Sequence, residues 1–178
     1  IKKTYAKSRF EDVNLDLASR SNEIYPGKIG FKEATETTHF SVMDKTGLMV
    51  ALTTTLNSSY GNKIVVPGTG MLMNNEMDDF SAKPNTENQF QLLGGEANSI
   101  APNKRMLSSM TPTIVTQDGE PFMITGTPGG STIITTVLQI ILNVVDHRMT
   151  IEDAVSLPRF HHQWKPDQIL FEQFAFSP

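Results

Sequence analysis

The strongest constraint on the fold is a hairpin pattern in residues 39–56. Apolar and polar side chains alternate along residues 39–44, where Phe40 and Val42 are the apolar members, and Met49, Ala51 and, less cleanly, Thr53 continue this period of two within residues 48–56. The turn-forming tetrad Asp44-Lys45-Thr46-Gly47 lies between these two runs. Alternation with a period of two is typical of strands with one buried face. The pattern therefore predicts an antiparallel β-hairpin.

A second hairpin is predicted further along the chain. Residues 112–115 and 122–125 have the composition of strands, and the dipeptide Asp118-Gly119 lies between them. Asp-Gly between two such runs is a strong signal for a tight hairpin turn.

Two helices are predicted after the second hairpin. Residues 133–145 are apolar on nearly every face, which fits a buried strand or a fully buried helix, and their length favours the helix, with Ser131 as its N-cap. Thr150 and Asp153 form an N-cap pattern for a short helix that reaches Ser156 and ends before Pro158. Paired strands followed by helices predict an α+β fold with a helix packed on a sheet.

The remaining segments are predicted to be mainly irregular. Residues 3–12 have the pattern of a short helix, and residues 13–36 that of an extended linker. Residues 57–70 and 81–106 are rich in polar turn residues, and a loop as long as the second one is usually functional or disordered.

Composition limits the possible functions. The chain has 178 residues, a net charge of −4, no run of basic residues and no cysteine. Nucleic-acid binding is therefore not expected, and disulfides, cysteine nucleophiles and thiolate metal sites are excluded. The sequence shows no apolar run long enough for a membrane span and no signal peptide. It starts at Ile1 without a methionine, and both ends suggest a piece of a longer protein.

Thr37 is a candidate nucleophile on one condition. A threonine hydroxyl reacts poorly unless a base lies beside it. A threonine at a chain N-terminus carries its own base, an α-amino group whose pKa is about 8. Thr37 therefore becomes important if the chain is cut after Glu36.

Three further patterns have both a functional and a structural interpretation. Gly129-Gly130 lies between a strand and a helix, where backbone N–H groups can form an oxyanion hole or an ordinary turn. The segment 74–79 can hold an ammonium group or a cation, or be a solvated acidic turn. Ser108-Ser109 can bind a carboxylate or simply precede a strand.

The adjacent pair His161-His162 with Trp164 does not predict a zinc site. Neighbouring side chains on a strand point in opposite directions, and no third ligand has a suitable spacing. A structural role is expected for this pair.

Taken together and in this order, the motifs resemble the C-terminal part of a γ-glutamyltranspeptidase, a family of N-terminal-nucleophile hydrolases. The similar blocks cover nearly all of residues 37–178: Thr37-Thr38-His39-Phe40-Ser41-Val42, Asn74-Asn75-Glu76-Met77-Asp78-Asp79-Phe80-Ser81, Pro102-Asn103-Lys104-Arg105, Leu107-Ser108-Ser109-Met110, Pro128-Gly129-Gly130-Ser131 and Pro158-Arg159-Phe160-His161. The resemblance implies part of a four-layer αββα sandwich. It also implies that residues 1–36 are the end of a large subunit with the linker before the cleavage site, and that residues 37–178 are a small catalytic subunit truncated at its C-terminus.

The resemblance also implies a zymogen that cuts itself between Glu36 and Thr37. The freed Thr37 would then take the γ-glutamyl group from glutathione or a similar donor and pass it to water or an amine. The implied site residues fall into four groups. Thr55 would hydrogen-bond the nucleophile, Gly129 and Gly130 would form the oxyanion hole, Asn57, Glu76 and Asp79 would hold the donor's α-amino group, and Ser108 and Ser109 would bind its α-carboxylate.

The implied partner is the large subunit of the same precursor, which would supply an arginine for the substrate carboxylate. No cofactor and no metal are implied, and the family suggests a secreted, periplasmic or cell-surface location. Three positions depart from the frequent family pattern: Phe90 in place of a lid tyrosine, Met106 in place of proline, and Thr132 in place of arginine.

Other functions remain open from sequence. An enzyme of the same fold, such as a cephalosporin-type acylase or a poly-γ-glutamate depolymerase, would share Thr37 and differ in its pocket. A non-catalytic relic would share the fold alone.

Overall fold

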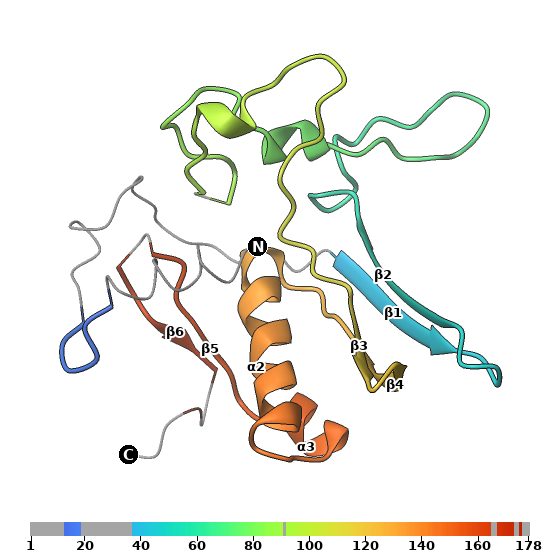
Figure 1. Ribbon diagram of the computed structural model, residues 1–178. Helices are drawn as coiled ribbons and strands as arrows, with labels where there is room; N and C mark the ends of the chain where they lie inside the picture. Colours follow the sequence, from blue (N-terminus) through green and yellow to red (C-terminus); the bar gives the residue numbers. More distant parts are fainter. Residues whose placement is uncertain (1–12, 19–36, 91, 165–166, 173–174, 176–178) are drawn as a thin grey trace.

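The computed structural model of the chain describes residues 13–18, 37–90, 92–164, 167–172 and 175. Within these residues the regular structure consists of two α-helices, short 3-10 turns and three two-stranded antiparallel sheets (Figure 1). The predicted α+β class is therefore confirmed. The predicted helix at 3–12, most of the linker and Glu36 lie outside the described residues.

The first predicted hairpin is present. Strand β1 (Thr37–Met43) pairs with β2 (Met49–Thr55), and the register places Thr37 opposite Thr55. β1 begins two residues before the predicted start, so Thr37 is its first residue. The Asp44 carboxylate closes the turn, because its Oδ1 accepts the backbone N–H groups of Thr46 and Leu48 at 2.8 and 3.0 Å.

The second hairpin is also confirmed. Strands β3 (Thr113–Gln117) and β4 (Glu120–Thr125) join through Asp118 and Gly119, whose φ angles of 53° and 89° are both positive, as a type I′ turn requires. This hairpin contacts β1–β2 and lies between that hairpin and helix α2 (Ile133–Val145) (Figure 1).

Helix α2 has the predicted bounds, but two expectations about it were wrong. Ser131 is not its N-cap, because residues Gly130–Thr132 already curl into a 3-10 turn, η4, which leaves Ser131 without the extended backbone of a cap. The helix is also not fully buried. Ile133, Val137 and Ile140 are buried, whereas Ile134 and Leu138 are 49% and 51% exposed, because the described chain covers one side of α2.

The core forms where β3–β4 meets α2 and the short helix α3 (Ile151–Ser156). Its buried centre is Met123, Ile140 and Ala154, from β4, α2 and α3 respectively. The predicted N-cap of α3 is confirmed, since Thr150 Oγ1 accepts the backbone N–H of Asp153 at 3.1 Å. This core holds α2 together with β4 and α3, and it thereby supports the turn that precedes α2.

Sequence reasoning did not predict the third sheet, in which β5 (Phe160–His161) pairs with β6 (Leu170–Phe171). The buried His161 ring hydrogen-bonds Thr135 Oγ1 at 2.7 Å through Nδ1 and Gln163 Oε1 at 3.0 Å through Nε2. This ring therefore ties β5 to α2, in agreement with the expected structural role.

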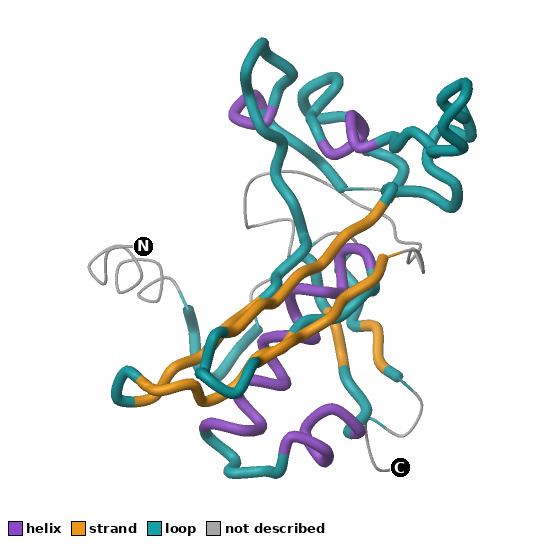
Figure 2. The backbone as a smooth tube through the Cα atoms, turned by 90° about the vertical axis from the view of Figure 1, so that its right-hand side faces the viewer, coloured by secondary structure: helices purple, strands orange, loops and turns teal. Residues whose placement is uncertain are grey.

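Residues 57–90 and 92–110, the 57–110 layer, are largely irregular and lie beyond the open ends of the two hairpins (Figure 2). Two 3-10 turns interrupt it, η2 (Glu76–Asp79) and η3 (Glu96–Asn98). Side-chain to backbone hydrogen bonds, described below, hold much of this layer in place. Among the described residues, no helix has the length and apolar character needed to cross a membrane.

Candidate active site

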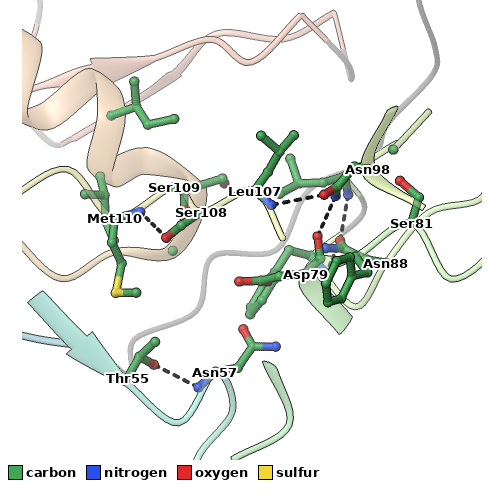
Figure 3. A pocket seen from close by; sticks show the side chains of 18 of the residues that line it. Thr55, Asn57, Asp79, Ser81, Asn88, Asn98, Leu107, Ser108, Ser109 and Met110 are labelled. Carbon is green, nitrogen blue, oxygen red and sulfur yellow. Dashed lines mark hydrogen bonds between the residues drawn. The ribbon is translucent and has the colours of Figure 1, made fainter. Parts of the chain in front are cut away.

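A cavity of about 380 Å³ lies where β1–β2, the 57–110 layer and the start of α2 meet (Figure 3). Most of the site residues expected from sequence line it, although they come from distant parts of the chain. These residues are Thr37, Thr55, Asn57, Asp79, Ser108, Ser109 and Gly130. Glu76 and Gly129 do not line the cavity but adjoin residues that do, and Glu36 lies outside the described residues.

Thr37 and Thr55 are directly opposite each other at the open end of the first hairpin. Directly opposed residues of antiparallel strands have Cβ atoms about 4.5–5.5 Å apart on one face of the sheet. Thr55 Oγ1 also accepts the backbone N–H of Asn57 at 2.9 Å, which orients its hydroxyl (Figure 3). The hairpin register thus brings two threonine hydroxyls together at the edge of the cavity.

Asn57 connects the end of β2 to the acidic turn. It is buried and has a φ of 74°, a left-handed conformation that asparagine tolerates better than most residues. Its Nδ2 donates to the carbonyl of Asn75 at 3.2 Å, and the Asn75 side chain accepts the N–H of Ser58 at 3.0 Å. These bonds fix the position of η2, which starts at the next residue, Glu76.

Glu76 and Asp79 occupy positions i and i+3 of η2, which fall on the same side of a 3-10 turn. Burial, the negative charge of Asp79 and a hydrogen bond between the two side chains raise the pKa of Glu76 to about 7. Burial also raises the pKa of Asp79, although the hydrogen bond from Glu76 acts in the opposite direction. The two carboxyl groups therefore hold a shared proton near neutral pH, with Glu76 as the donor, and an entering cation would favour ionisation of both.

Ser108 and Ser109 reach the cavity because a buried asparagine anchors the segment that carries them. Asn98 Oδ1 accepts the N–H of Leu107 at 3.0 Å, and Asn98 Nδ2 donates to the carbonyl of Asp79 at 2.7 Å (Figure 3). Asn98 therefore fixes the serine pair relative to the carboxylates. Ser108 Oγ accepts the N–H of Met110 at 3.1 Å, so its hydroxyl hydrogen can be donated elsewhere.

Asn98 and Ser81 were not identified from sequence. Both are buried and line the cavity. Ser81 ends the similar block 74–81, where no role is assigned to it, and Asn98 lies in a long polar stretch in which no motif distinguishes it from the exposed polar residues nearby.

The glycine pair adopts a backbone that favours glycine strongly. The φ angles of Gly129 and Gly130 are 135° and 57°, and the chain then enters η4 and α2. No side chain caps either helical start. The first N–H groups of a helical segment lack intrahelical acceptors, so this turn can offer hydrogen-bond donors to an oxyanion.

The charge distribution of the cavity suits one kind of ligand. Asp79 supplies a carboxylate, and the described lining residues include no lysine, arginine or histidine. An ammonium group is therefore favoured near Asp79, while a carboxylate of the same ligand would meet the serine hydroxyls. The site can thus bind a zwitterionic group next to two threonine hydroxyls.

The sequence and the fold of the chain are similar to those of known proteins. A family described as gamma-glutamyltranspeptidase matches residues 1–178. The chain is similar to the glutathione hydrolase proenzyme of Escherichia coli (strain K12), with 52% identity over 176 residues that make up 99% of this chain and 30% of the relative. It is 48% identical to the glutathione hydrolase proenzyme of Pseudomonas sp. (strain A14) over 176 residues, with the same coverage.

A solved structure gives the corresponding match in three dimensions. An acivicin-inhibited gamma-glutamyltranspeptidase superposes with a TM-score of 0.76 at 54% identity, covering 79% of this chain and 74% of that one. The fold is therefore that of the N-terminal-nucleophile hydrolases. The chain spans 30% of the length of the two relatives named above.

Proposed function

The chain belongs to the γ-glutamyltranspeptidase family, and we propose on that premise that it carries the nucleophile of a γ-glutamyl hydrolase/transferase. The observation that carries the proposal is the position of Thr37, opposite Thr55 and on the wall of a cavity that also contains Asp79, Ser108 and Gly130. On this proposal the nucleophile lies beside a pocket for a zwitterion and a turn whose N–H groups can serve as donors.

The first proposed step is self-cleavage of the precursor. The Thr37 hydroxyl attacks the carbonyl of Glu36, and the amide nitrogen leaves that carbonyl as an ester forms to Thr37 Oγ. Water then hydrolyses the ester, which releases Glu36 as a carboxylate and Thr37 as a free N-terminus. On this proposal residues 1–36 end the large subunit and residues 37–178 belong to the small one, and the two remain associated as a heterodimer.

The second proposed step is acyl transfer. The free α-amino group of Thr37 accepts the proton of the Thr37 hydroxyl, which attacks the γ-carbonyl of the donor. The N–H groups of Gly129 and Gly130 stabilise the oxyanion, and loss of one such donor typically costs about 10²–10³ in rate. The donor amine leaves with a proton, and the threonyl ester is then resolved by water or by an acceptor amine.

The proposed donor is glutathione or a similar γ-glutamyl compound. Its α-ammonium is held by Asn57, Glu76 and Asp79, and its α-carboxylate by Ser108 and Ser109. Charge supports this orientation, because hydrogen bonds between ionised and neutral groups are stronger than those between neutral groups. An arginine from the large subunit completes the carboxylate site. We also propose a secreted, periplasmic or cell-surface location, on the basis of family membership.

A matched pair of variants in the full-length protein tests the proposal. Thr37→Ala is expected to leave the bond between residues 36 and 37 intact and to abolish turnover of γ-glutamyl-p-nitroanilide. Thr38→Ala is the control, because Thr38 is exposed on the opposite face of β1 and pairs with Thr54, and it is expected to retain both activities.

The alternatives give different results in the same assay. A cephalosporin-type acylase would cleave itself but would release a bulky acyl group in preference to γ-glutamate. A poly-γ-glutamate depolymerase would prefer the polymer to a single γ-glutamyl amide. A non-catalytic relic would neither cleave itself nor turn over any of these substrates.

A further inference from the structure

We infer that His39 is a positioning residue whose ring sets the spacing between β1 and the turn that carries Gly129 and Gly130. The inference rests on the proposed function, because it concerns how Thr37 is placed against that turn. The proposed steps of self-cleavage and donor binding give His39 no role, so the inference adds this residue to the mechanism.

His39 lies two residues after Thr37 on the same face of β1. Both ring nitrogens have hydroxyl partners: Nδ1 lies 2.8 Å from Thr53 Oγ1, and Nε2 lies 2.9 Å from Ser41 Oγ. Burial lowers the pKa of the imidazole, which favours the neutral ring. A neutral ring has one donor and one acceptor nitrogen, and the two hydroxyls can match either tautomer. The ring is therefore fixed in orientation within the hairpin.

The ring is also packed against the backbone of Gly126. A Cβ built on Gly126 would overlap ring atoms Cε1 and Nδ1 of His39 and would lie 2.7 Å from Nε2. The φ of Gly126 is not in the left-handed region, so its backbone conformation alone does not require glycine. Glycine is needed at this position because the imidazole occupies the space that a side chain would take.

This contact joins the two parts of the proposed catalytic machinery. Gly126 directly follows β4 and precedes Gly129 by three residues, while His39 follows Thr37 by two. The ring is thus a spacer between the strand that carries the nucleophile and the chain that leads to the oxyanion turn. A shift of about 1 Å in the placement of reacting groups can cost about 100-fold in rate.

A double-mutant cycle in the full-length protein tests the inference. The proteins are wild type, His39→Ala, Gly126→Ala and the double variant, with kcat and KM for γ-glutamyl-p-nitroanilide and the thermal midpoint as readouts. His39→Ala is expected to lower kcat about 100-fold with little change in KM, because the donor pocket is built by other segments. Gly126→Ala is expected to lower kcat and the thermal midpoint in wild type but to have little effect on either in the His39→Ala background, where the ring is gone.

Matched controls separate this effect from general damage. Gly95→Ala adds a methyl where nothing lies within 4 Å, and His147→Ala removes an exposed ring; both are expected to behave like wild type. If Gly126→Ala does not fold, recovery of folding in the double variant supports the inference. His39→Gln keeps a donor and an acceptor without the ring, and wild-type kcat in this variant would overturn the inference.

Equal effects of Gly126→Ala in the wild-type and His39→Ala backgrounds would also overturn the inference. A rise in KM with kcat unchanged in His39→Ala would overturn it as well. Failure of the proposed function has a different signature. Wild type would then show neither cleavage at residue 37 nor turnover, and the four thermal midpoints would still report whether the ring and Gly126 are sterically coupled.

Discussion

At the scale of single residues, the candidate site depends on backbone conformations that few side chains allow. Gly129 has a φ of 135°, which is accessible in practice only to glycine, and Asn57 has a φ of 74°. Both lie where the chain changes direction next to the cavity. Substitution at these positions is therefore expected to affect function more than burial alone would indicate.

The first prediction concerns Gly129. Gly129→Ala should strain the turn and move the N–H donors, so kcat in the full-length protein should fall by about 10²–10³, as for loss of an oxyanion donor. Steady-state kinetics with γ-glutamyl-p-nitroanilide measures this. Gly95→Ala is the control, because its backbone is extended and its Cβ would meet no neighbour. Unchanged kcat in Gly129→Ala would remove this turn from the mechanism.

The second prediction concerns the shared proton of Glu76 and Asp79. On the proposed function, the donor's α-ammonium is held by both carboxylates in their ionised forms, whereas the pKa of Glu76 is raised to about 7. KM for the donor should therefore fall as pH rises through about 7. In Glu76→Gln, KM should be higher and should vary less with pH over the same range. Glu87→Gln, at an exposed carboxylate, should leave the wild-type profile intact, and a persistent pH dependence in Glu76→Gln would contradict the assignment.

The same shift has a consequence for stability. A carboxyl group whose pKa is raised on folding binds its proton more tightly in the folded state than in the unfolded state. The contribution of Glu76 to the free energy of unfolding is therefore fully present below its ordinary pKa of 4.5 and is lost as pH rises through about 7. Denaturant titrations between pH 4.5 and about 7 should show that the free energy of unfolding of the wild type falls as pH rises. The Glu76→Gln variant should lack the part of this fall that is due to Glu76.

At the scale of elements, the sequence was a good guide wherever local chemistry decides the structure. The two hairpins follow from alternation and turn residues, and α3 follows from the cap formed by Thr150. The bounds of α2 were also predicted, since thirteen successive residues suit a helix better than a strand. In these segments the neighbouring residues contain most of the structural information.

The errors arose where distant segments decide the structure. Ser131 has the composition of an N-cap, but the preceding glycine pair adopts positive φ angles and η4 starts before it. The exposure of Ile134 and Leu138 depends on what covers α2, which local sequence does not specify. Asn98 orders the carboxylates relative to the serine pair through contacts nine and nineteen residues away. The site residues themselves were assigned from the family resemblance, because the isolated motifs left both interpretations open.

The third prediction tests the cap of α3. Thr150→Ala removes the acceptor for the N–H of Asp153 and should lower the free energy of unfolding by about 1 kcal/mol. Ser156→Ala changes a small polar residue at the other end of the same helix and should have a much smaller effect. Chemical denaturation of both variants measures the difference. Equal small effects would show that the Thr150 cap contributes little.

At the scale of the whole molecule, the chain has large apolar surfaces that its own described residues do not cover. On the outer face of β1–β2, Phe40, Val42, Val50 and Leu52 are between 40% and 53% exposed. The exposed apolar residues of α2 form a further uncovered surface on another side of the molecule. Monomeric soluble proteins rarely expose contiguous apolar patches of this kind, and such patches usually mark a surface that a partner covers.

The fourth prediction follows from that surface. The chain of residues 1–178 expressed alone should self-associate in a concentration-dependent way and should not turn over γ-glutamyl-p-nitroanilide. Light scattering coupled to size exclusion measures the association. Replacing Val42 and Leu52 with threonine should reduce the self-association, whereas the same replacement of the cavity-lining Leu92 should not. A monomeric, active chain would show that no large subunit is needed.

The central claim is that Thr37 becomes a chain N-terminus and acts as the nucleophile. Intact mass and N-terminal sequencing of the purified full-length protein test it most directly. We predict two chains, one of which begins Thr37-Thr38-His39, and a single uncut chain for Thr37→Ala. A wild-type preparation that turns over the donor while the bond between residues 36 and 37 remains intact would contradict the claim.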